Sequence, residues 1–354
     1  MWSSALRLAG GTFQSARAMN YSTSSKTIRH LMSISDLTPN EFSKLVLNAA
    51  AHKKAVKSGC IPKNLHSKLT GQTIAMIFNK LSTRTRVSTE AAVAMMGGHP
   101  MFLGKGDIQL GVNESLLDTS KVISSMTSCL VARVGPHDDI LNLAKHSSVP
   151  VINALSNDFH PLQIIADFLT IHESIPKGSA DADSIVPKGL NVAWVGDANN
   201  VLFDFATACV KLGVGISVAT PRGYGIPEEM SNRIRNQAKS TQTPGKLHEV
   251  TDPEEGVKDA DIIITDTWIS MGQEKETQKR LKDFAGFQVT NDLAERGGAK
   301  PDWKFMHCLP RHPEEVDDDV FYSARSLVFP EAENRLWAAV AALEAFVVNK
   351  GVIL

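Results

Sequence analysis

The sequence lacks the features of several classes of protein. It has four cysteines among 354 residues (Cys60, Cys129, Cys209 and Cys308), and none of them forms a CxxC pair. Such scattered thiols indicate reduced cysteines and argue against both a disulfide framework and a structural zinc site. No stretch approaches the roughly 18 uninterrupted apolar residues of a membrane-spanning helix. The formal net charge of −1 gives no support to a nucleic-acid partner, which would favour a basic surface. We therefore expect neither a membrane nor a nucleic acid as partner.

Acidic residues are missing from the first 35 positions, and the first acid is Asp36. The basic residues of this segment are Arg7, Arg17, Lys26 and Arg29. A basic, serine-rich and acid-poor leader is typical of a mitochondrial transit peptide, and its apolar part is too short for a secretory signal. A disordered tail has a similar composition. We expect residues 1–25 to be a transit peptide and the protein to lie in the mitochondrial matrix.

Short apolar runs alternate with helical patterns along the rest of the chain. The runs that predict buried strands are residues 73–78, 129–134, 149–154, 190–196, 215–221, 260–266, 305–310 and 326–330. Helical stretches between them include residues 90–96, 164–171 and 204–212. Strands rich in valine and isoleucine, each followed by a helix, indicate parallel sheets in an α/β architecture.

A segment rich in glycine, proline, serine and aspartate, residues 173–189, is the best candidate for a linker. It divides the chain into domains at 32–172 and 190–333. The helical pattern at 334–350 is apolar almost all round and must pack on a large surface, so we expect it to complete the first domain. The predicted fold class is therefore α/β, with two domains, each a central parallel sheet flanked by helices, and a cleft between them.

Two glycine-containing stretches bear on cofactor binding. "VGDANN" (195–200) follows a predicted strand, but it lacks the second and third glycines of GxGxxG, so it predicts dinucleotide binding only weakly. "GGHPMFLGKG" (97–106) is one residue too long for a P-loop, and Gly106 stands where serine or threonine is needed. We expect no cofactor.

The stretch "KLSTRTRVSTE" (80–90) carries two arginines and several hydroxyls where a strand gives way to a helix. Cations at a helix N-terminus oppose the macrodipole, and a bound anion would resolve the conflict. Backbone N–H groups, the hydroxyls of Ser82, Thr83 and Thr85, and the fork of Arg84 together suit a single phosphate of a small metabolite. An ordinary helix cap with solvated arginines is the alternative.

The run "STRTR" resembles the carbamoyl-phosphate signature of the aspartate/ornithine carbamoyltransferase family. "HPLQ" (160–163), "DTWISMG" (266–272), "HCLP" (307–310) and "FPEAENR", which ends at Arg335, match in the same order. The resemblance covers most of the chain from about residue 32, and "SMG" with "HCLP" is similar to the ornithine-using branch. It implies transfer of the carbamoyl group from carbamoyl phosphate to the side-chain amine of L-ornithine, giving L-citrulline and phosphate. It also implies no metal or organic cofactor, and a homotrimer with shared active sites.

The resemblance also implies roles for individual residues. The catalytic candidates are Arg84, Arg133, His160 and Cys308. The residues expected to bind carbamoyl phosphate are Ser82, Thr83, Arg84, Thr85, Gln109, Arg133, His160, Gln163, Cys308, Leu309 and Arg335. Within this set Arg84 and Arg335 would neutralise the phosphate, Arg133 and His160 would polarise the carbonyl, and Gln163 and the Leu309 carbonyl would take the NH2 group. Gln109 would reach the site of a neighbouring subunit. Cys308 could orient the amine, accept its proton or only fill space.

Charge gives an argument about the second substrate. Ornithine carries an α-ammonium and an α-carboxylate; Asp266 can accept the ammonium, and Asn200 can bind the zwitterion through its amide. Ser270 and the Met271 backbone complete the ornithine set by resemblance. Aspartate would bring two carboxylates and favour an arginine-lined site, so a diamino acid is preferred. Two alternatives remain open: another amine, such as putrescine or acetylornithine, and a catalytically silent paralogue that binds a metabolite or a partner.

Overall fold

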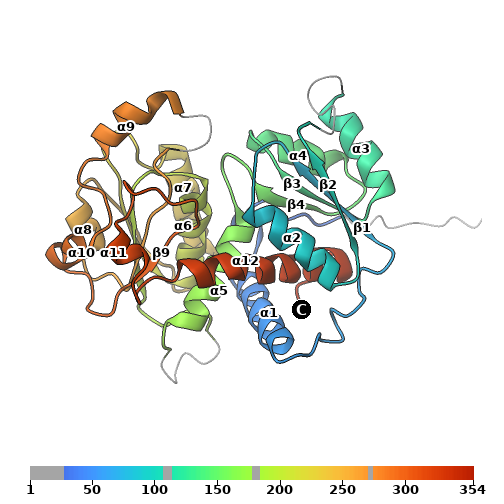
Figure 1. Ribbon diagram of the computed structural model, residues 1–354, viewed down its shortest axis with the longest axis horizontal. Helices are drawn as coiled ribbons and strands as arrows, with labels where there is room; N and C mark the ends of the chain where they lie inside the picture. The colour runs from blue at the N-terminus through green and yellow to red at the C-terminus, as the bar shows by residue number, and fades with distance from the viewer. Residues whose placement is uncertain (1–27, 107–113, 178–183, 270–273) are drawn as a thin grey trace, which may run out of the picture.

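The protein contains two parallel β-sheets, each flanked by helices (Figure 1). The structure is a computed structural model and describes residues 28–106, 114–177, 184–269 and 274–354. The first sheet has the order β2-β1-β3-β4 and the second the order β7-β6-β5-β8-β9. Their strands are β1 (Thr73–Phe78), β2 (His99–Gly104), β3 (Cys129–Arg133), β4 (Val151–Leu155), β5 (Asn191–Val195), β6 (Gly215–Ala219), β7 (Leu247–Val250), β8 (Ile262–Ile264) and β9 (Lys304–Met306). All of these pairings are parallel, which confirms the predicted fold class.

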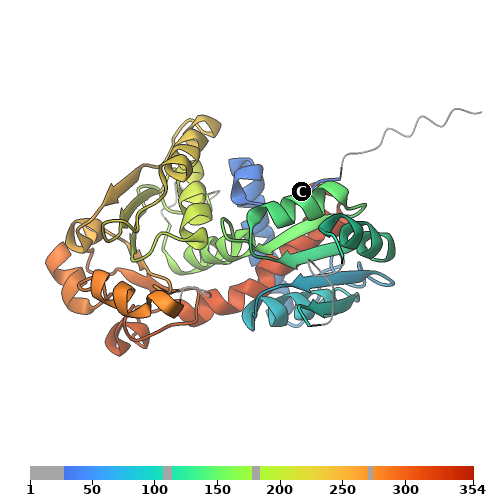
Figure 2. The same cartoon turned by 90° about the horizontal axis from the view of Figure 1, so that it is seen from above.

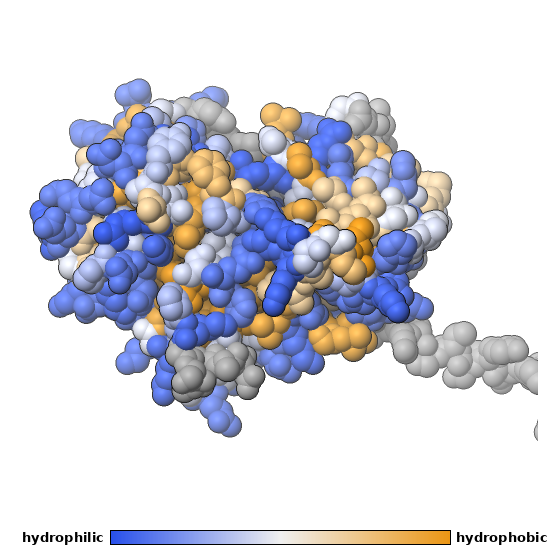
Figure 3. Space-filling view, turned by 60° about the horizontal axis from the view of Figure 1, so that its bottom comes forward, coloured by the Kyte–Doolittle hydropathy of each residue, from blue (hydrophilic) through white to orange (hydrophobic). Residues whose placement is uncertain are grey.

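Each sheet has its own set of helices. The part of the molecule around the first sheet is called the first half, and the part around the second sheet the second half. The helices of the first half are α1 (Pro39–Lys57), α2 (Arg84–Met95), α3 (Leu116–Met126), α4 (His137–His146) and α5 (Pro161–Ser174). Those of the second half are α6 (Asn200–Leu212), α7 (Glu228–Asn236), α8 (Pro253–Val257), α9 (Thr277–Asp283), α10 (Asn291–Gly297) and α11 (Asp318–Phe321). Among the described residues no helix has the length and apolar character needed to cross a membrane. On the face drawn in Figure 3, hydrophilic and hydrophobic residues are interspersed.

The last predicted strand, at 326–330, is wrong. Only Ser326 makes an isolated bridge, to Phe305, and Val328 already begins α12 (Val328–Leu343). Pro330 lies in the first turn of this helix, where the missing N–H breaks no intrahelical bond. The predicted strand 305–310 is also too long, because β9 ends at Met306 and "HCLP" forms a loop.

Helix α12 joins the two halves. It begins six residues before the predicted 334, and a π-helical turn at Glu344–Val348 follows its last residue. It contacts α1, α2 and α5 of the first half and β9 of the second. Two views at right angles show that it runs between the two halves (Figures 1 and 2).

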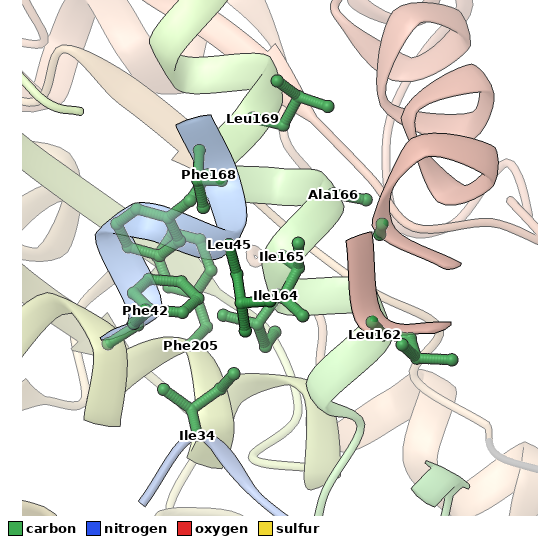
Figure 4. Close-up of a cluster of buried hydrophobic side chains, with 14 of the residues drawn as sticks. Ile34, Phe42, Leu45, Leu162, Ile164, Ile165, Ala166, Phe168, Leu169 and Phe205 are labelled. Atoms are coloured by element: carbon green, nitrogen blue, oxygen red, sulfur yellow. The ribbon is translucent and has the colours of Figure 1, made fainter. Parts of the chain in front are cut away.

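A continuous hydrophobic core also holds the halves together. Phe168 of α5 lies between Phe42 of α1 and Phe205 of α6, with 5.2 Å between ring centroids in each pair. Figure 4 shows these rings beside Ile34 and Leu45. Burying one such ring contributes about 1.5–3 kcal/mol relative to leaving it exposed. Because the aromatic cluster draws on helices of both halves, the relation of the two sheets is fixed by packing.

Candidate active site

A cavity of about 620 Å³ lies between the two halves, beyond the carboxyl ends of β1, β3, β8 and β9. Open parallel sheets bind ligands at this edge. The cavity is lined by every predicted site residue that the structure describes: Ser82, Thr83, Arg84, Thr85, Arg133, His160, Gln163, Asn200, Asp266, Cys308, Leu309 and Arg335. Gln109, Ser270 and Met271 lie outside the described residues.

Helix α2 opens the phosphate side of the cavity. The helix starts at Arg84, six residues before the predicted helical stretch 90–96, and its N-cap Thr83 makes no side-chain capping bond. Ser82 takes over the capping, since its Oγ accepts a hydrogen bond from the Thr85 N–H at 3.2 Å. The Thr83 side chain is therefore not used in capping, and the N-terminus of α2 beside it is suited to an anion.

The two arginines of "STRTR" point to different places. Arg84 lines the cavity and donates to the backbone carbonyl of Leu309, which belongs to the other half of the molecule. Arg86 is exposed; it pairs with Glu90 at 2.9 Å, and its guanidinium carbon lies 3.7 Å from the centroid of the Phe102 ring. The alternative of a solvated arginine thus describes Arg86, whereas Arg84 faces the cavity as the phosphate-site interpretation expects.

Three arginines converge on the cavity with few acids to neutralise them. Burial, followed by the charges of Arg335 and Arg84, lowers the pKa of Arg133 to about 10. Burial and the charge of Arg84 likewise lower the pKa of Arg335 to about 10. The pKa of His160 falls well below its usual value because of burial and the same three charges. A cationic cluster with a neutral imidazole is suited to a bound dianion such as a phosphate.

Several buried nitrogens of this cluster have no partner among the described residues: Nε of Arg133, Nε of Arg335 and Nδ1 of His160. Buried polar atoms are nearly always hydrogen-bonded, so unpartnered ones in a cavity wall indicate a ligand. The His160 backbone is fixed, since its N–H donates to Oδ2 of Asp204 at 3.0 Å.

Gln163 links the arginines to a buried acidic pair. Its Oε1 accepts from Nη1 of Arg335, and its Nε2 donates to Asp167 at 2.7 Å and to Glu331 at 3.2 Å. Nη2 of Arg335 donates to Oγ1 of Thr85 at 3.0 Å. The amide orientation of Gln163 is therefore determined by its neighbours, with the carbonyl oxygen on the arginine side.

The opposite side of the cavity is acidic. The Cys308 thiol donates to Oδ1 of Asp266 at 3.1 Å, and Asn199 donates to Oδ2 of Asp266 at 2.7 Å. Burial, and then the Asp266 charge, raise the pKa of Cys308 well above its usual value, so the group is a thiol. Asn200 donates its amide N–H to the backbone carbonyl of Ser156 at 2.6 Å.

One trio of metal-ligand types occurs beside the thiol. The ligand atoms of Asp266, His307 and Cys308 lie within 4.8 Å of one another. Both ring nitrogens of His307 are already used, because Nδ1 accepts from the Leu309 N–H at 2.9 Å and Nε2 bonds Glu315 at 3.1 Å. An ion would have to break one of these bonds, so the donor set does not fit a metal centre.

The sequence analysis missed several polar residues around the cavity. They are Asp167, Asn199, Asp204, Glu315 and Glu331, of which all but Asn199 are buried. Asn199 stands in "VGDANN" and Glu331 in "FPEAENR", so the motifs contain them. The partners of Asn199, Asp204 and Glu331 come from distant parts of the chain, and only the fold shows them.

The comparisons with known proteins agree with this geometry. Residues 29–173 match the model of the carbamoyl-P binding domain of aspartate/ornithine carbamoyltransferase, and residues 188–346 match the model of its Asp/Orn binding domain. A relative from Coccidioides immitis named "Ornithine carbamoyltransferase, mitochondrial" is 67% identical over 94% of this chain and 97% of its own. One from Aspergillus niger with the same name is 62% identical over 98% of this chain and 94% of its own. These names confirm the mitochondrial location expected from the leader.

Solved structures show the same likeness. A crystal structure of the mitochondrial ornithine carbamoyltransferase of C. immitis is 64% identical, covers 93% of this chain and all of its own, and has a TM-score of 0.87. The ornithine carbamoyltransferase of Pyrococcus furiosus is 44% identical over 91% of this chain and 97% of its own, with a TM-score of 0.81. The cavity between the two halves, the ordered motifs and these matches lead to one conclusion: the chain belongs to the aspartate/ornithine carbamoyltransferase family.

Proposed function

We propose that this protein is an ornithine carbamoyltransferase, which moves the carbamoyl group of carbamoyl phosphate to the side-chain amine of L-ornithine and releases L-citrulline and phosphate. This is a step of arginine biosynthesis. The observation that carries the proposal is one cavity with a cluster of three arginines on one side and the Asp266–Cys308 pair on the other. A dianionic donor fits the first side, and an amino acid with a second amine fits the other.

On the donor side, the phosphate binds Ser82, Thr83 and the N–H groups that open α2, and Arg84 and Arg335 neutralise it. The unpartnered nitrogens of Arg133 and His160 donate to the carbonyl oxygen and stabilise the oxyanion that forms there. The carbonyl oxygens of the Gln163 side chain and the Leu309 backbone accept from the carbamoyl NH2.

On the acceptor side, the Asp266 carboxylate receives the α-ammonium of ornithine, and Ser270 and the Met271 backbone take the α-carboxylate. The Asn200 amide nitrogen is engaged by Ser156, so its carbonyl oxygen is the atom that meets the substrate. Cys308, a thiol rather than a thiolate, orients the amine and does not act as a base. The leaving phosphate then takes the proton of the amine.

The two substrates divide between two domains in this proposal. Residues 32–172, completed by the helix at 334–350, bind carbamoyl phosphate; residues 190–333 bind ornithine, and 173–189 link them. The matched family models cover residues 29–173 and 188–346, and the second also includes most of the helix at 334–350.

We also propose a homotrimer in which Gln109 enters the site of a neighbouring subunit. Support comes from large apolar side chains exposed near the phosphate loop and on α3: Leu81 is 88% exposed, Val87 62% and Met126 70%. Side chains of this size are normally covered, and a subunit contact would cover them. Light scattering should give three times the chain mass, and Leu81→Glu should lower it; a monomeric wild type contradicts this part.

The decisive experiment measures citrulline formation by purified protein lacking the leader. Carbamoyl phosphate is supplied with ornithine and, in parallel, with aspartate, putrescine and acetylornithine. Turnover with ornithine alone is expected. Turnover with another amine only would keep the donor site and overturn the role of Asp266, whereas binding of carbamoyl phosphate without any turnover would favour the silent paralogue.

A further inference from the structure

Glu331 connects the two sides of the cavity. It lies in the first turn of α12, and only 2% of it is exposed. Its Oε1 accepts from Nε2 of Gln163 at 3.2 Å, and its Oε2 accepts from the backbone N–H of His307 at 3.0 Å. Gln163 belongs to α5 in the first half, and His307 directly follows β9 in the second.

We propose that Glu331 is a positioning residue that couples carbamoyl-phosphate binding to ornithine binding by holding Gln163 with one carboxyl oxygen and the "HCLP" loop with the other. The inference rests on the proposed function and assigns this residue a role within it.

On the donor side, the bond fixes which way the Gln163 amide faces. Nε2 is occupied by Asp167 and Glu331, so Oε1 is turned to Arg335 and to the place of the carbamoyl group. A Gln163 amide rotated by half a turn would present N–H groups to the carbamoyl NH2, and two donors cannot bond each other. Losing the Glu331 acceptor removes one of the two bonds that prevent this rotation.

On the acceptor side, Glu331 holds the start of the loop that carries Cys308. The His307 ring then fixes its end, because Nδ1 accepts from the Leu309 N–H. Leu309 has a φ of 63°, a left-handed conformation that non-glycine residues rarely adopt. Such a conformation persists only where surrounding contacts hold it. The Leu309 carbonyl also meets Arg84, so a displaced loop would disturb both substrates.

Charge at this position is balanced by a shared proton. Asp167 and Glu331 hydrogen-bond each other, and burial raises the pKa of Asp167 to about 7 and that of Glu331 well above its usual value. The raised pKa values favour a protonated form of the pair, and the charge that remains faces the cation of Arg335. In an Asp167→Asn variant, the amide N–H can donate to Glu331 in place of the proton between the two acids. This variant therefore provides a control.

The test compares Glu331→Gln with the wild type. The carboxamide offers one acceptor oxygen where two separate donors, Gln163 Nε2 and His307 N–H, need one each. The readout is the Kd of L-norvaline, an ornithine analogue without the reacting amine, measured by calorimetry with and without carbamoyl phosphate. Coupling between two sites commonly changes an affinity 5- to 150-fold. The norvaline ratio is the Kd without carbamoyl phosphate divided by the Kd with it. We expect a ratio of about 5 to 150 for the wild type and a ratio near 1 for Glu331→Gln. We also expect the variant to have a kcat/KM reduced about 10- to 100-fold.

Two variants serve as controls. Asp167→Asn keeps an acceptor for Gln163 and a donor for Glu331, so its ratio and activity should stay within about threefold of the wild type. Glu344→Gln alters another buried glutamate, in the turn after α12, which bonds His52 and Asn64. It should lower the melting temperature and leave the ratio unchanged, which separates coupling from stability.

The outcomes distinguish this inference from the proposed function. A wild type that makes no citrulline overturns the function itself. An active wild type with an unchanged norvaline ratio in folded Glu331→Gln overturns the coupling role. If that variant does not fold, Glu331→Asp keeps both oxygens but draws them back by one methylene; the same loss of coupling is expected, and an unchanged ratio counts against the inference.

Discussion

Replacing Arg84 by methionine tests the phosphate site most directly, because the same motif supplies its own control. Arg84 and Arg86 are two residues apart in "STRTR", and both lie in the first turn of α2. Arg84 lines the cavity, whereas Arg86 is exposed and bonds Glu90. Methionine keeps most of the apolar side chain and a good helix propensity in both variants.

The size of the effect follows from the bonds that each arginine makes. Arg84→Met removes a charged donor from the Leu309 carbonyl and another from the phosphate. A hydrogen bond to a charged group contributes about 1.5–3 kcal/mol, so the two together correspond to a loss of about 10²- to 10⁴-fold in kcat/KM for carbamoyl phosphate. Arg86→Met loses an exposed pair of about 0.3–0.5 kcal/mol and a ring contact, neither of which touches the cavity.

Steady-state kinetics with carbamoyl phosphate as the varied substrate distinguishes the two variants. Arg86→Met should remain within about threefold of the wild type, since the lost pair is exposed and screened. The assignment of the phosphate site would be refuted by equal losses in the two variants, or by an Arg84→Met enzyme with unchanged kcat/KM. Circular dichroism of both variants checks that α2 still forms.

Three further predictions concern ionisation. Because the pKa of His160 lies well below its usual value, the pH profile of kcat/KM from pH 5.5 to 9 should contain no titration step near pH 6.5 that comes from His160. A step near pH 6.5 that is present in the wild type and absent in His160→Asn would contradict a neutral imidazole. At pH 8 iodoacetamide should modify the exposed Cys60 well before Cys308, and Asp266→Asn should speed the reaction of Cys308 by removing a charge that raises its pKa; mass spectrometry follows both sites. Burial raises the pKa of Asp204 from 3.8 to about 7, so the folded state binds more protons than the unfolded state between these values. The wild type should therefore lose stability relative to Asp204→Asn as the pH rises from about 4 to about 7, by up to ~4 kcal/mol, and lose no more above it; a melting-temperature difference that is independent of pH would contradict this.

The sequence predicts the interior strands better than the edges because burial on both faces produces continuous apolar runs. The strand β1 matches its predicted bounds of 73–78, and β5 lies within its predicted run. The two strands that sequence analysis missed, β2 and β7, each lie at one edge of their sheet, although the strands at the other edges, β4 and β9, overlap predicted runs. β2 contains Pro100, which an edge tolerates, and β7 reads "LHEV" with two exposed polar residues. The error at 326–330 has the opposite cause, since Leu327, Val328 and Phe329 form a β-like run that tertiary packing places at the start of a helix.

The site residues divide in a similar way. Arg133 ends a strand, Arg84 begins a helix and His160 caps one, all at one sheet edge, so their position can be predicted from the order of the elements. Glu331 and Asp204 are buried acids on helices, and a helical acid in a sequence is normally read as solvent-facing. Their roles depend on Gln163, His307 and other residues more than 20 positions away, and sequence spacing alone contains no signal for such contacts.

The cavity also favours the form of the nucleophile that the reaction requires. An alkylammonium must lose a proton before it can attack a carbonyl. Lys80 places such a group at the cavity wall, where its Nζ donates to Asn157 at 2.8 Å. Burial and the charge of Arg133 lower the pKa of Lys80, so this environment already penalises an ammonium ion. An ornithine side chain entering the same space meets the same desolvation and the same cation, and the neutral amine is favoured there. In the proposed mechanism, the bound phosphate opposes this effect through its charge and receives the proton of the amine as it leaves.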